Sequence, residues 1–321
     1  MSPLELAGTN LASPPVLAFA LGAASVLFRS DLRLPDAVHV GLTTYLLLAI
    51  GLKGGAELSA VSPSTVFLPA VAAVLVGLAI PCWSFLIARR AGGLSVEDAA
   101  SLAAHYGSVS VVTFTAAITF LDAAGDPAEG FLPALVAIME VPGIAMAILL
   151  ARFAGGGART PMSESLRDVF GGRSIMLLGG GLAIGIASGK EGFERVAPFF
   201  QEPFYGVLVV FLLEMGIVAA ARAHDVLRSG PFLVAFGTGL PLLHGALGVA
   251  AGSAAGLSVG GATALGTLAA SASYIAAPAA VRIALPGANH GYALAAALAI
   301  TFPFNLVVGI PLYHQFAKMI G

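Results

Sequence analysis

Two short runs of serine and other small residues lie inside apolar segments of the sequence. HYGSVSVVTF contains Ser108 and Ser110, and AASASYIAAP contains Ser271 and Ser273 and ends at Pro278. Proline disrupts the helix around it, and a helix that begins inside an apolar segment presents backbone N–H groups that suit an anion. The alternative is that these small residues only allow helices to pack closely. Their occurrence as a matched pair favours a site for a small anion.

Oxygen-bearing side chains stand next to prolines in two other apolar segments. Glu140 lies two residues before Pro142, and Thr301 lies two residues before Pro303, with Asn305 one turn further on. A carboxylate in such a segment costs several kcal/mol unless it is paired, protonated or facing water, so it is a functional candidate by default. A hard cation such as sodium prefers oxygen ligands. The residues therefore predict a sodium site. Hydrogen bonds between helices are the alternative explanation, and they explain Thr301 and Asn305 better than they explain Glu140.

Enzyme motifs are missing from the sequence. It contains no HExxH, G-x-S-x-G, Walker or CxxC pattern. An intramembrane enzyme would need a nucleophile and a base together, and only His105 with Ser108 comes near. No histidine pair has metal-ligand spacing, so we expect no catalysis, no cofactor and no transition metal. Glu214, in FLLEMG, is either a second buried charge or part of a bond between helices.

The composition places the chain in a membrane. Of the 321 residues, 58% are hydrophobic and 10% are charged, against about 25% charged in a typical soluble domain. The mean hydropathy is +0.94. The net charge of -2 gives no indication of nucleic-acid binding. No Lys or Arg precedes Leu17, so a cleavable signal peptide is not expected.

Ten apolar segments predict an all-α integral membrane fold with ten transmembrane helices. They lie near residues 15–29, 37–53, 66–88, 97–121, 131–152, 173–188, 203–221, 231–255, 260–285 and 291–317. We predict a first five-helix repeat over 1–154, a polar cytoplasmic linker over 155–172, and a second five-helix repeat over 173–321.

The basic residues predict the orientation. With the N-terminus outside, 11 of the 15 basic residues lie inside, namely Arg29, Arg33, Arg89, Arg90, Arg152, Arg159, Arg167, Arg173, Arg222, Arg228 and Arg282. The other 4 lie outside, namely Lys53, Lys190, Arg195 and Lys318. The positive-inside rule therefore places both termini outside.

The two halves resemble each other in order. The serine runs occupy the fourth and ninth segments, the oxygen-then-proline patterns occupy the fifth and tenth, and LLLAIGLKGG in the second corresponds to FLLEMGIVAA in the seventh. Five helices per half put the halves in opposite orientation. This pattern is typical of a secondary transporter built from an inverted repeat, with helices 4 and 9 broken.

Several stretches closely resemble the sodium-dependent bicarbonate transporter family best known from cyanobacteria. They are FLLEMGIVAAAR (Phe211–Arg222), TLAASASYIAAPAAVRIALPGAN (Thr267–Asn289), ITFPFNLVVGIPLY (Ile300–Tyr313), GLKGGAELS (Gly51–Ser59) and PFFQEPFYGVL (Pro198–Leu208). The resemblance runs over nearly the whole chain and is most specific in the second half.

The resemblance implies a core domain and a gate domain, a homotrimer, and sodium-coupled bicarbonate uptake at the crossing of helices four and nine. It also implies a PII-like regulator, although the cyanobacterial members have a longer linker than residues 155–172. The residues that would line the substrate site by this resemblance are Gly107, Ser108, Val109, Ser110, Ser271, Ala272, Ser273 and Tyr274.

The leading hypothesis is therefore a plasma-membrane (inner-membrane) symporter of sodium and bicarbonate. A sodium-coupled carrier of another small anion, such as an organic acid, is the alternative within transport. An intramembrane enzyme, a channel and a structural membrane subunit are the alternatives from other classes. Accumulation against a gradient that depends on sodium separates a carrier from a channel.

Overall fold

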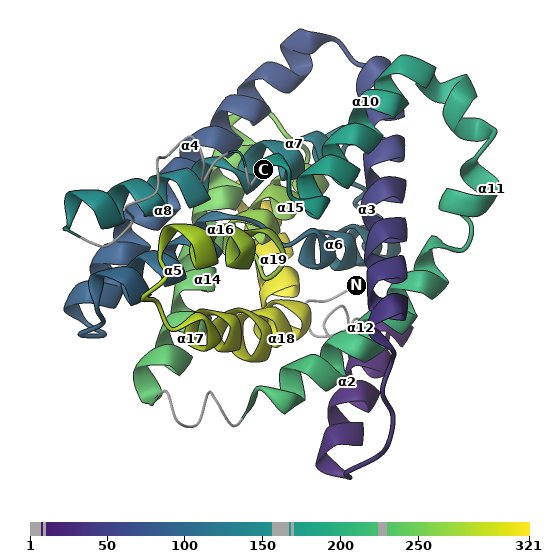
Figure 1. Cartoon of the computed structure of the whole chain (residues 1–321). Coiled ribbons are helices and arrows are strands. Elements are labelled where there is room, and N and C mark those ends of the chain that lie inside the picture. Colours follow the sequence, from purple (N-terminus) through teal and green to yellow (C-terminus); the bar gives the residue numbers. More distant parts are fainter. Residues whose placement is uncertain (1–7, 9–10, 156–166, 168–169, 224–229) are drawn as a thin grey trace.

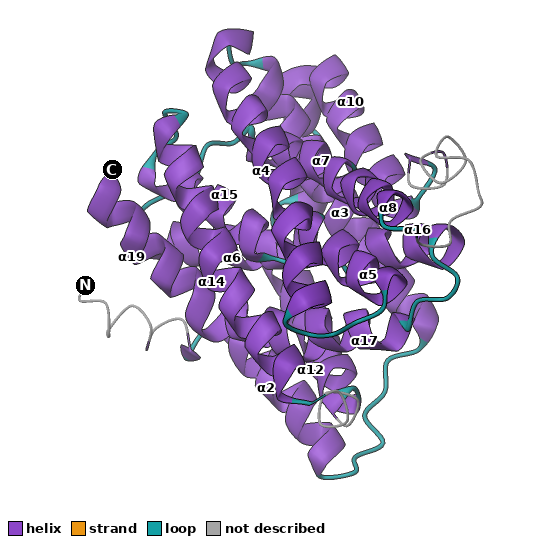
Figure 2. Ribbon diagram, turned by 90° about the vertical axis from the view of Figure 1, so that its left-hand side faces the viewer, coloured by secondary structure: helices purple, strands orange, loops and turns teal. Residues whose placement is uncertain are grey.

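The computed structural model describes residues 8, 11–155, 167, 170–223 and 230–321. Within these residues the fold is built from helices joined by loops, without a β-strand (Figure 2). The described residues thus agree with the prediction of an all-α fold. The predicted linker over 155–172 lies mostly outside the described residues.

The first half begins with one short and two long continuous helices and continues with two interrupted ones. The bounds are α2 Pro14–Leu27, α3 Asp36–Ser59, α4 Pro63–Arg90, α5 Val96–Gly107, α6 Val111–Ala124, α7 Leu132–Glu140 and α8 Pro142–Phe153. The interruptions fall between α5 and α6 and between α7 and α8, at the serine run and at Pro142.

The second half has the same kinds of element. The bounds are α10 Arg173–Glu194, α11 Ala197–Phe200, α12 Phe204–Ala221, α14 Pro231–Ala254, α15 Val259–Ala270 and α16 Ala276–Ala284. The last segment alternates between α- and π-helix as α17 His290–Ala295, η1 Ala296–Thr301, α18 Phe302–Phe304, η2 Asn305–Gly309 and α19 Ile310–Ile320.

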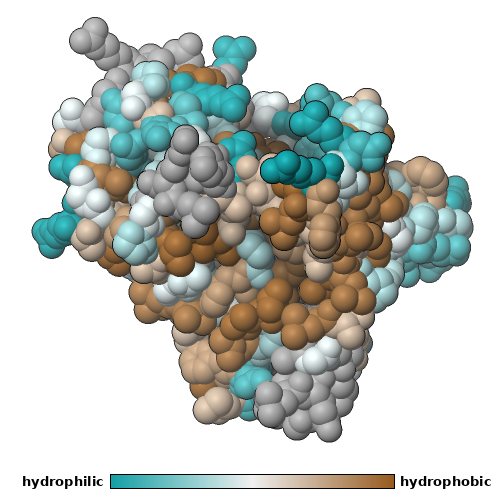
Figure 3. Space-filling view, turned by 90° about the horizontal axis from the view of Figure 1, so that it is seen from below, coloured by the Kyte–Doolittle hydropathy of each residue, from teal (hydrophilic) through white to brown (hydrophobic). Residues whose placement is uncertain are grey.

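Seven segments of the described chain are long and apolar enough to cross a membrane. They are Asp36–Ser59, Pro63–Arg90, Val96–Ala124, Leu132–Phe153, Ala197–Ala221, Pro231–Ala254 and His290–Ile320. The apolar helix α2 has 14 residues, or about 21 Å at 1.5 Å per residue, which is shorter than a bilayer core of about 30 Å. Ten spanning helices therefore remain a prediction. Figure 3 shows one face of the molecule with a broad apolar area, and hydrophilic residues gather mainly above it and to its right.

Helices α2, α3, α10 and α12 pack in pairs, α3 on α10 and α2 on α12 (Figure 1). Glycines one turn apart allow this close approach. A Cβ atom on Gly51 of α3 would lie 2.6 Å from a backbone oxygen of α10 and 3.0 Å from Cα of Gly181. Gly55 and Gly185 repeat the contact four residues further on. Two helices with small residues at such spacing pack backbone to backbone.

The other helices form a second group. Here α5 packs on α4 and α8, α15 packs on α14 and α19, and α4 contacts α14. Gly143 at the start of α8 lies so close to Gly107 at the end of α5 that a Cβ atom there would overlap the Gly107 backbone. This group holds both serine runs and both oxygen-then-proline patterns.

The loop between α6 and α7 joins the end of the chain to the first half. Asp126 accepts hydrogen bonds from Lys318 Nζ and from His314 Nε2, each at 2.8 Å. Lys318 lowers the pKa of the Asp126 carboxyl below its usual range, and His314 adds to the effect. Glu129 in the same loop accepts from the backbone N–H of Ser258 at 2.6 Å. These contacts bring the starts of α7 and α15 and the end of α19 to one end of the molecule.

Candidate functional site

The first helix break runs from Ser108 to Ser110. Ser108 and Ser110 are both extended, with φ of -102° and -108°. Ser110 then caps α6, because its Oγ accepts a hydrogen bond from the N–H of Thr113 at 3.2 Å. Serine favours this role, since its short side chain reaches an amide that has no intrahelical partner. The serine therefore starts a new helix inside the apolar segment.

In the second break, residues 271–275, two serine hydroxyls again bond to backbone groups. Ser271 ends α15 and donates from Oγ to the carbonyl of Leu268 at 2.7 Å. Ser273 accepts at Oγ from the N–H of Ala277 in the first turn of α16, at 3.2 Å. The hydroxyl proton of Ser273 remains available to another acceptor.

The two breaks contact each other directly. The N–H of Ser110 donates to Oγ of Ser271 at 2.8 Å, and the N–H of Ser273 donates to the carbonyl of His105 at 2.7 Å. All four serines of the two runs are at most 4% exposed. The structure therefore brings the two predicted runs together, at the place where α5 and α15 end and α6 and α16 begin.

The crossing carries partial positive charge where α6 and α16 begin. The first N–H groups of a helix have no intrahelical acceptor and carry partial positive charge. In α6 these belong to Val111 and Val112, since Thr113 is capped by Ser110. In α16 the first is that of Ala276. Two helix starts that face one buried crossing form an environment suited to a small anion.

Glu140 lies beside the first break. It ends α7, and its backbone carbonyl accepts a hydrogen bond from Ser108 Oγ at 3.0 Å. Its side chain faces the Ser174 hydroxyl of α10. Glu140 is 1% exposed, and its Oε2 has no hydrogen-bond partner among the described residues. A buried carboxylate oxygen without a partner is costly, and a bound cation or a proton would offset that cost.

Thr301 lies beside the other side of the crossing, at the end of the π-helical stretch η1. Its Oγ1 donates to the carbonyl of Gly237 at 2.8 Å. The hydroxyl of Tyr106 lies 2.6 Å from the same Oγ1 and therefore acts as the donor. Tyr106 immediately precedes Gly107, so Thr301 contacts the first break through one side chain.

Asn305 begins the second π-helical stretch, η2. Its Nδ2 donates to the carbonyl of Ala270, just before the second break, at 2.8 Å. The hydroxyl of Tyr313 lies 2.9 Å from Asn305 Oδ1 and 3.0 Å from the carbonyl of Pro241. One hydroxyl proton satisfies one of these acceptors at a time. When Tyr313 donates to Pro241, the oxygen of Asn305 is open to a cation. Short π-helical stretches within a helix frequently mark functional sites.

The predicted sodium residues each connect to the crossing, but the hydrogen bonds of the described residues do not join all three to one another. Within the described residues no hydrogen bond joins Glu140 to Thr301 or Asn305. Each touches the crossing through another residue, namely Ser108, Tyr106 or Ala270. Sequence reasoning missed Tyr106 and Tyr313. Tyr106 is next to the candidate Gly107, whereas Tyr313 lies eight residues after Asn305, about two helical turns away, and so had only its place in an apolar run as a signal.

Two further candidates have structural partners. His105 Nδ1 donates to the carbonyl of Ser101 at 2.8 Å, and in the described chain its ring does not bond to Ser108. That nucleophile–base pair is therefore not formed. Glu214 of α12 lies 2.9 Å from His39 of α3, so it takes part in a contact between helices, one of the two alternatives that the sequence left open.

The sequence was compared with known proteins and with protein families. No curated protein sequence matches the chain. The profile of the Na+-dependent bicarbonate transporter superfamily matches residues 14–318. This match includes both helix breaks and all of the residues described above. The chain therefore belongs to the Na+-dependent bicarbonate transporter superfamily.

Proposed function

We propose that this protein is a secondary active transporter that couples inward sodium flow to uptake of bicarbonate across the plasma membrane. The observation that supports this most is the buried contact between the two broken helices, in which Ser110 N–H binds Ser271 Oγ and Ser273 N–H binds the His105 carbonyl. A crossing of helix starts at mid-membrane is the usual place for an anionic substrate in a secondary transporter.

In this proposal the chain is an inverted repeat of five plus five helices. The order of elements supports it, because α5, a break and α6 in one half correspond to α15, a break and α16 in the other. The packing supports it as well. Exchanging the halves converts the α3–α10 pair into the α12–α2 pair, and both pairs are present.

The anion would be held at the crossing by backbone N–H groups and by Ser273. The hydroxyls of Ser108 and Ser271 are already used as donors to carbonyls, whereas the proton of Ser273 is available. A hydrogen bond to a charged group is worth about 1.5–3 kcal/mol. Ser273→Ala should therefore raise the apparent KM for bicarbonate about tenfold to a hundredfold.

Ser258→Ala is the matched control for that variant. Ser258 accepts from the N–H of Gly261 in the first turn of α15 at 3.0 Å, as Ser273 accepts from an N–H in the first turn of α16, but Ser258 lies at the other end of α15. Its replacement removes a cap and leaves the crossing intact. Equal KM values for Ser273→Ala and the parent protein would place the anion elsewhere.

Sodium would bind beside the anion, at oxygens of Glu140, Thr301 and Asn305 and at carbonyls left free by Pro142 and Pro303. The unpartnered Oε2 of Glu140 supports this, and a cation there would offset the cost of an anion inside the membrane. Because linkage is reciprocal, sodium and bicarbonate should each tighten the other's binding by the same factor.

The decisive experiment is uptake of labelled bicarbonate into proteoliposomes, with and without an inward sodium gradient. Glu140→Gln removes the charged ligand and should raise the half-activating sodium concentration about tenfold or more. Glu214→Gln, which changes a carboxylate paired with His39, is the control and should not. If wild-type uptake does not depend on sodium, the proposed coupling is wrong.

The proposal also includes termini outside the cell, a homotrimer and control by a PII-like partner. The contacts of Asp126 with His314 and Lys318 support a common side for the C-terminal end and the α6–α7 loop. In a variant that lacks Cys82, a cysteine at Ser62 should react with an impermeant thiol reagent in intact cells, and one at Gly92 should not. The reverse result would invert the orientation.

A further inference from the structure

A cavity of about 480 Å³ lies between α3, the α6–α7 region and the segment that joins α11 to α12. Its wall includes Phe114 and Thr115 of α6, Lys53 of α3, and Tyr205 at the start of α12. It therefore lies between the helix group of α3 and α12 and the helix group that holds the crossing.

Lys53 is an unusual residue for such a place. It lies six residues before the end of α3, or about 9 Å along the helix at 1.5 Å per residue, within a segment apolar enough to span a membrane. It forms no ion pair with any residue that the structure describes. By contrast, Lys190 on the neighbouring α10 pairs with Glu57 at 3.0 Å. A lysine in a spanning segment is costly unless it faces water or a partner, and the cavity supplies the water.

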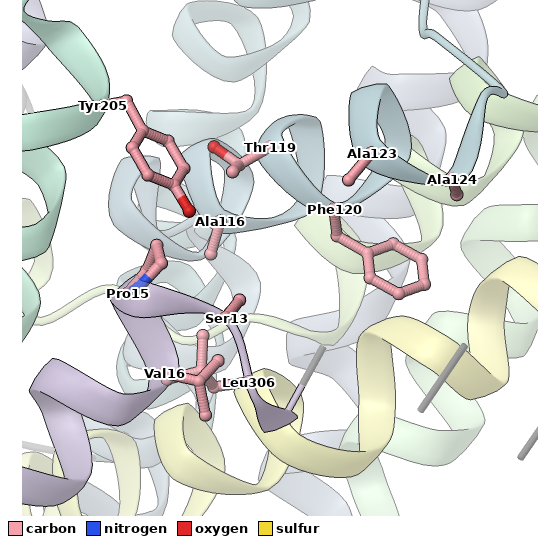
Figure 4. A pocket seen from close by; sticks show the side chains of 10 residues that line it. All are labelled: Ser13, Pro15, Val16, Ala116, Thr119, Phe120, Ala123, Ala124, Tyr205 and Leu306. Atoms are coloured by element: carbon pink, nitrogen blue, oxygen red, sulfur yellow. The ribbon is translucent and has the colours of Figure 1, made fainter. Parts of the chain in front are cut away.

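The cavity leads toward the crossing. Phe114, in the first turn of α6, lies one helical turn from the N-cap residue Ser110, or about 6 Å along the helix. A smaller cavity of about 130 Å³ adjoins it and shares Thr119 and Tyr205 (Figure 4). The two cavities thus follow the side of α6 that begins at the first break.

Other charges lining the cavity are carboxylates. Glu129 is held by its bond to the backbone N–H of Ser258, and Asp122, on the last turn of α6, is exposed. Lys53 is thus the cation of the cavity wall, and Asp122 is close enough to interact with it electrostatically. The cavity wall thus carries one cation and two carboxylates, so a small anion is attracted specifically to its Lys53 side.

We propose that this cavity is the entrance through which the small anion reaches the crossing, and that the unpaired ammonium group of Lys53 attracts the anion into it. The inference rests on the proposed function for the identity of the anion. Charges along a cleft with apolar walls raise the local concentration of an oppositely charged ligand about tenfold or more, and the effect is screened by salt.

The first test measures the charge preference of the cavity without transport. A single cysteine is placed at Thr119 in protein that lacks Cys82. Its reaction rates with an anionic and with a cationic methanethiosulfonate are then compared in purified protein. Lys53→Gln should lower the ratio of anionic to cationic rates about five- to tenfold at low salt, and the difference should shrink at about 0.5 M salt.

Lys190→Gln is the matched control, because it removes a nearby lysine that does not line the cavity. It should leave the ratio unchanged. An unchanged ratio in Lys53→Gln, or an equal change in Lys190→Gln, would overturn the inference, whether or not the protein carries bicarbonate.

The second test measures uptake at fixed sodium. Lys53→Gln should raise the apparent KM for bicarbonate about five- to tenfold with little change in the maximal rate, and Lys53→Arg should restore it. A changed reagent ratio with an unchanged KM would mean that the cavity is not on the substrate path, which overturns the inference. Wild-type protein without sodium-dependent uptake would refute the proposed function instead, and the reagent ratio would still decide the role of Lys53.

Discussion

Replacing Ser271 by alanine tests whether the contact between the two helix breaks holds the crossing together. Ser271 is 0% exposed, and its Oγ accepts from the N–H of Ser110 and donates to the carbonyl of Leu268. That carbonyl also accepts the N–H of residue 271 at 3.1 Å, so it keeps a partner in the variant. The main loss is the amide of Ser110, which is left buried without an acceptor.

The size of the effect follows from that amide. A buried donor without a partner costs about 1–3 kcal/mol, and interhelical hydrogen bonds in membranes average about 0.6 kcal/mol with a maximum of about 1.7. We therefore expect a loss of about 1–2 kcal/mol in the free energy of unfolding. At 2–4 °C per kcal/mol, this lowers the thermal midpoint by about 2–8 °C.

The assay is the fraction of protein that remains folded after heating in detergent, followed by size-exclusion chromatography. Ser84→Ala is the matched control, because Ser84 is also 0% exposed and its Oγ has no partner within the described residues. Its replacement removes no hydrogen bond and should change the midpoint little. Uptake should be measured well below both midpoints, where Ser271→Ala should be impaired and Ser84→Ala should not.

Equal midpoints for the two variants would refute the reasoning. That result would mean that Ser110 finds another acceptor, or that the two breaks are not joined by this bond. A lower midpoint with unimpaired uptake would show that the bond stabilises the fold without shaping the site.

Gly143→Ala should disrupt the packing of α8 on α5, because a Cβ atom there would overlap the backbone of Gly107; overpacking costs about 1–3 kcal/mol, measurable as a lower unfolding temperature. Asp126→Asn should lower the thermal midpoint at neutral pH, because Lys318 holds the pKa of the Asp126 carboxyl below its usual range. A carboxyl with a lowered pKa stabilises the fold above its unfolded-state pKa, and this stabilisation is lost as the pH falls through the folded-state pKa. The difference between Asp126→Asn and the parent should therefore close on acidification.

The controls for these two variants differ. Gly179 of α10 has no atom within 4 Å of a Cβ placed there, so Gly179→Ala should be tolerated, and equal destabilisation would contradict the packing argument for Gly143. A midpoint difference for Asp126→Asn that stays constant from neutral to acidic pH would show that the charge of Asp126 does not contribute.

Part of the candidate site could be predicted because it depends on local chemistry. Serine caps a helix through an amide two or three residues away, so Ser110 marks the start of α6 within its own segment. Pro142 begins α8 for a similarly local reason, since proline suits the first turn of a helix. Local chemistry of this kind does not decide whether Glu140, Thr301 and Asn305 form one cation site, because that depends on how separate helices pack. The cation site therefore stays a prediction.

The sequence by itself determined that this is a helical membrane protein of a sodium-dependent bicarbonate transporter superfamily, and where its helices break. Composition is sufficient to indicate a helical membrane protein, and local backbone chemistry is sufficient to indicate the breaks. The family follows from the resemblance of the quoted stretches and from the profile match over residues 14–318. Only the tertiary structure decided that Ser110 binds Ser271, 161 residues away, and that Tyr106 binds Thr301, 195 residues away. It also decided that Lys53 faces a cavity. These contacts arise when distant helices pack, and the partner of a buried polar group then depends on the neighbour that the packing supplies.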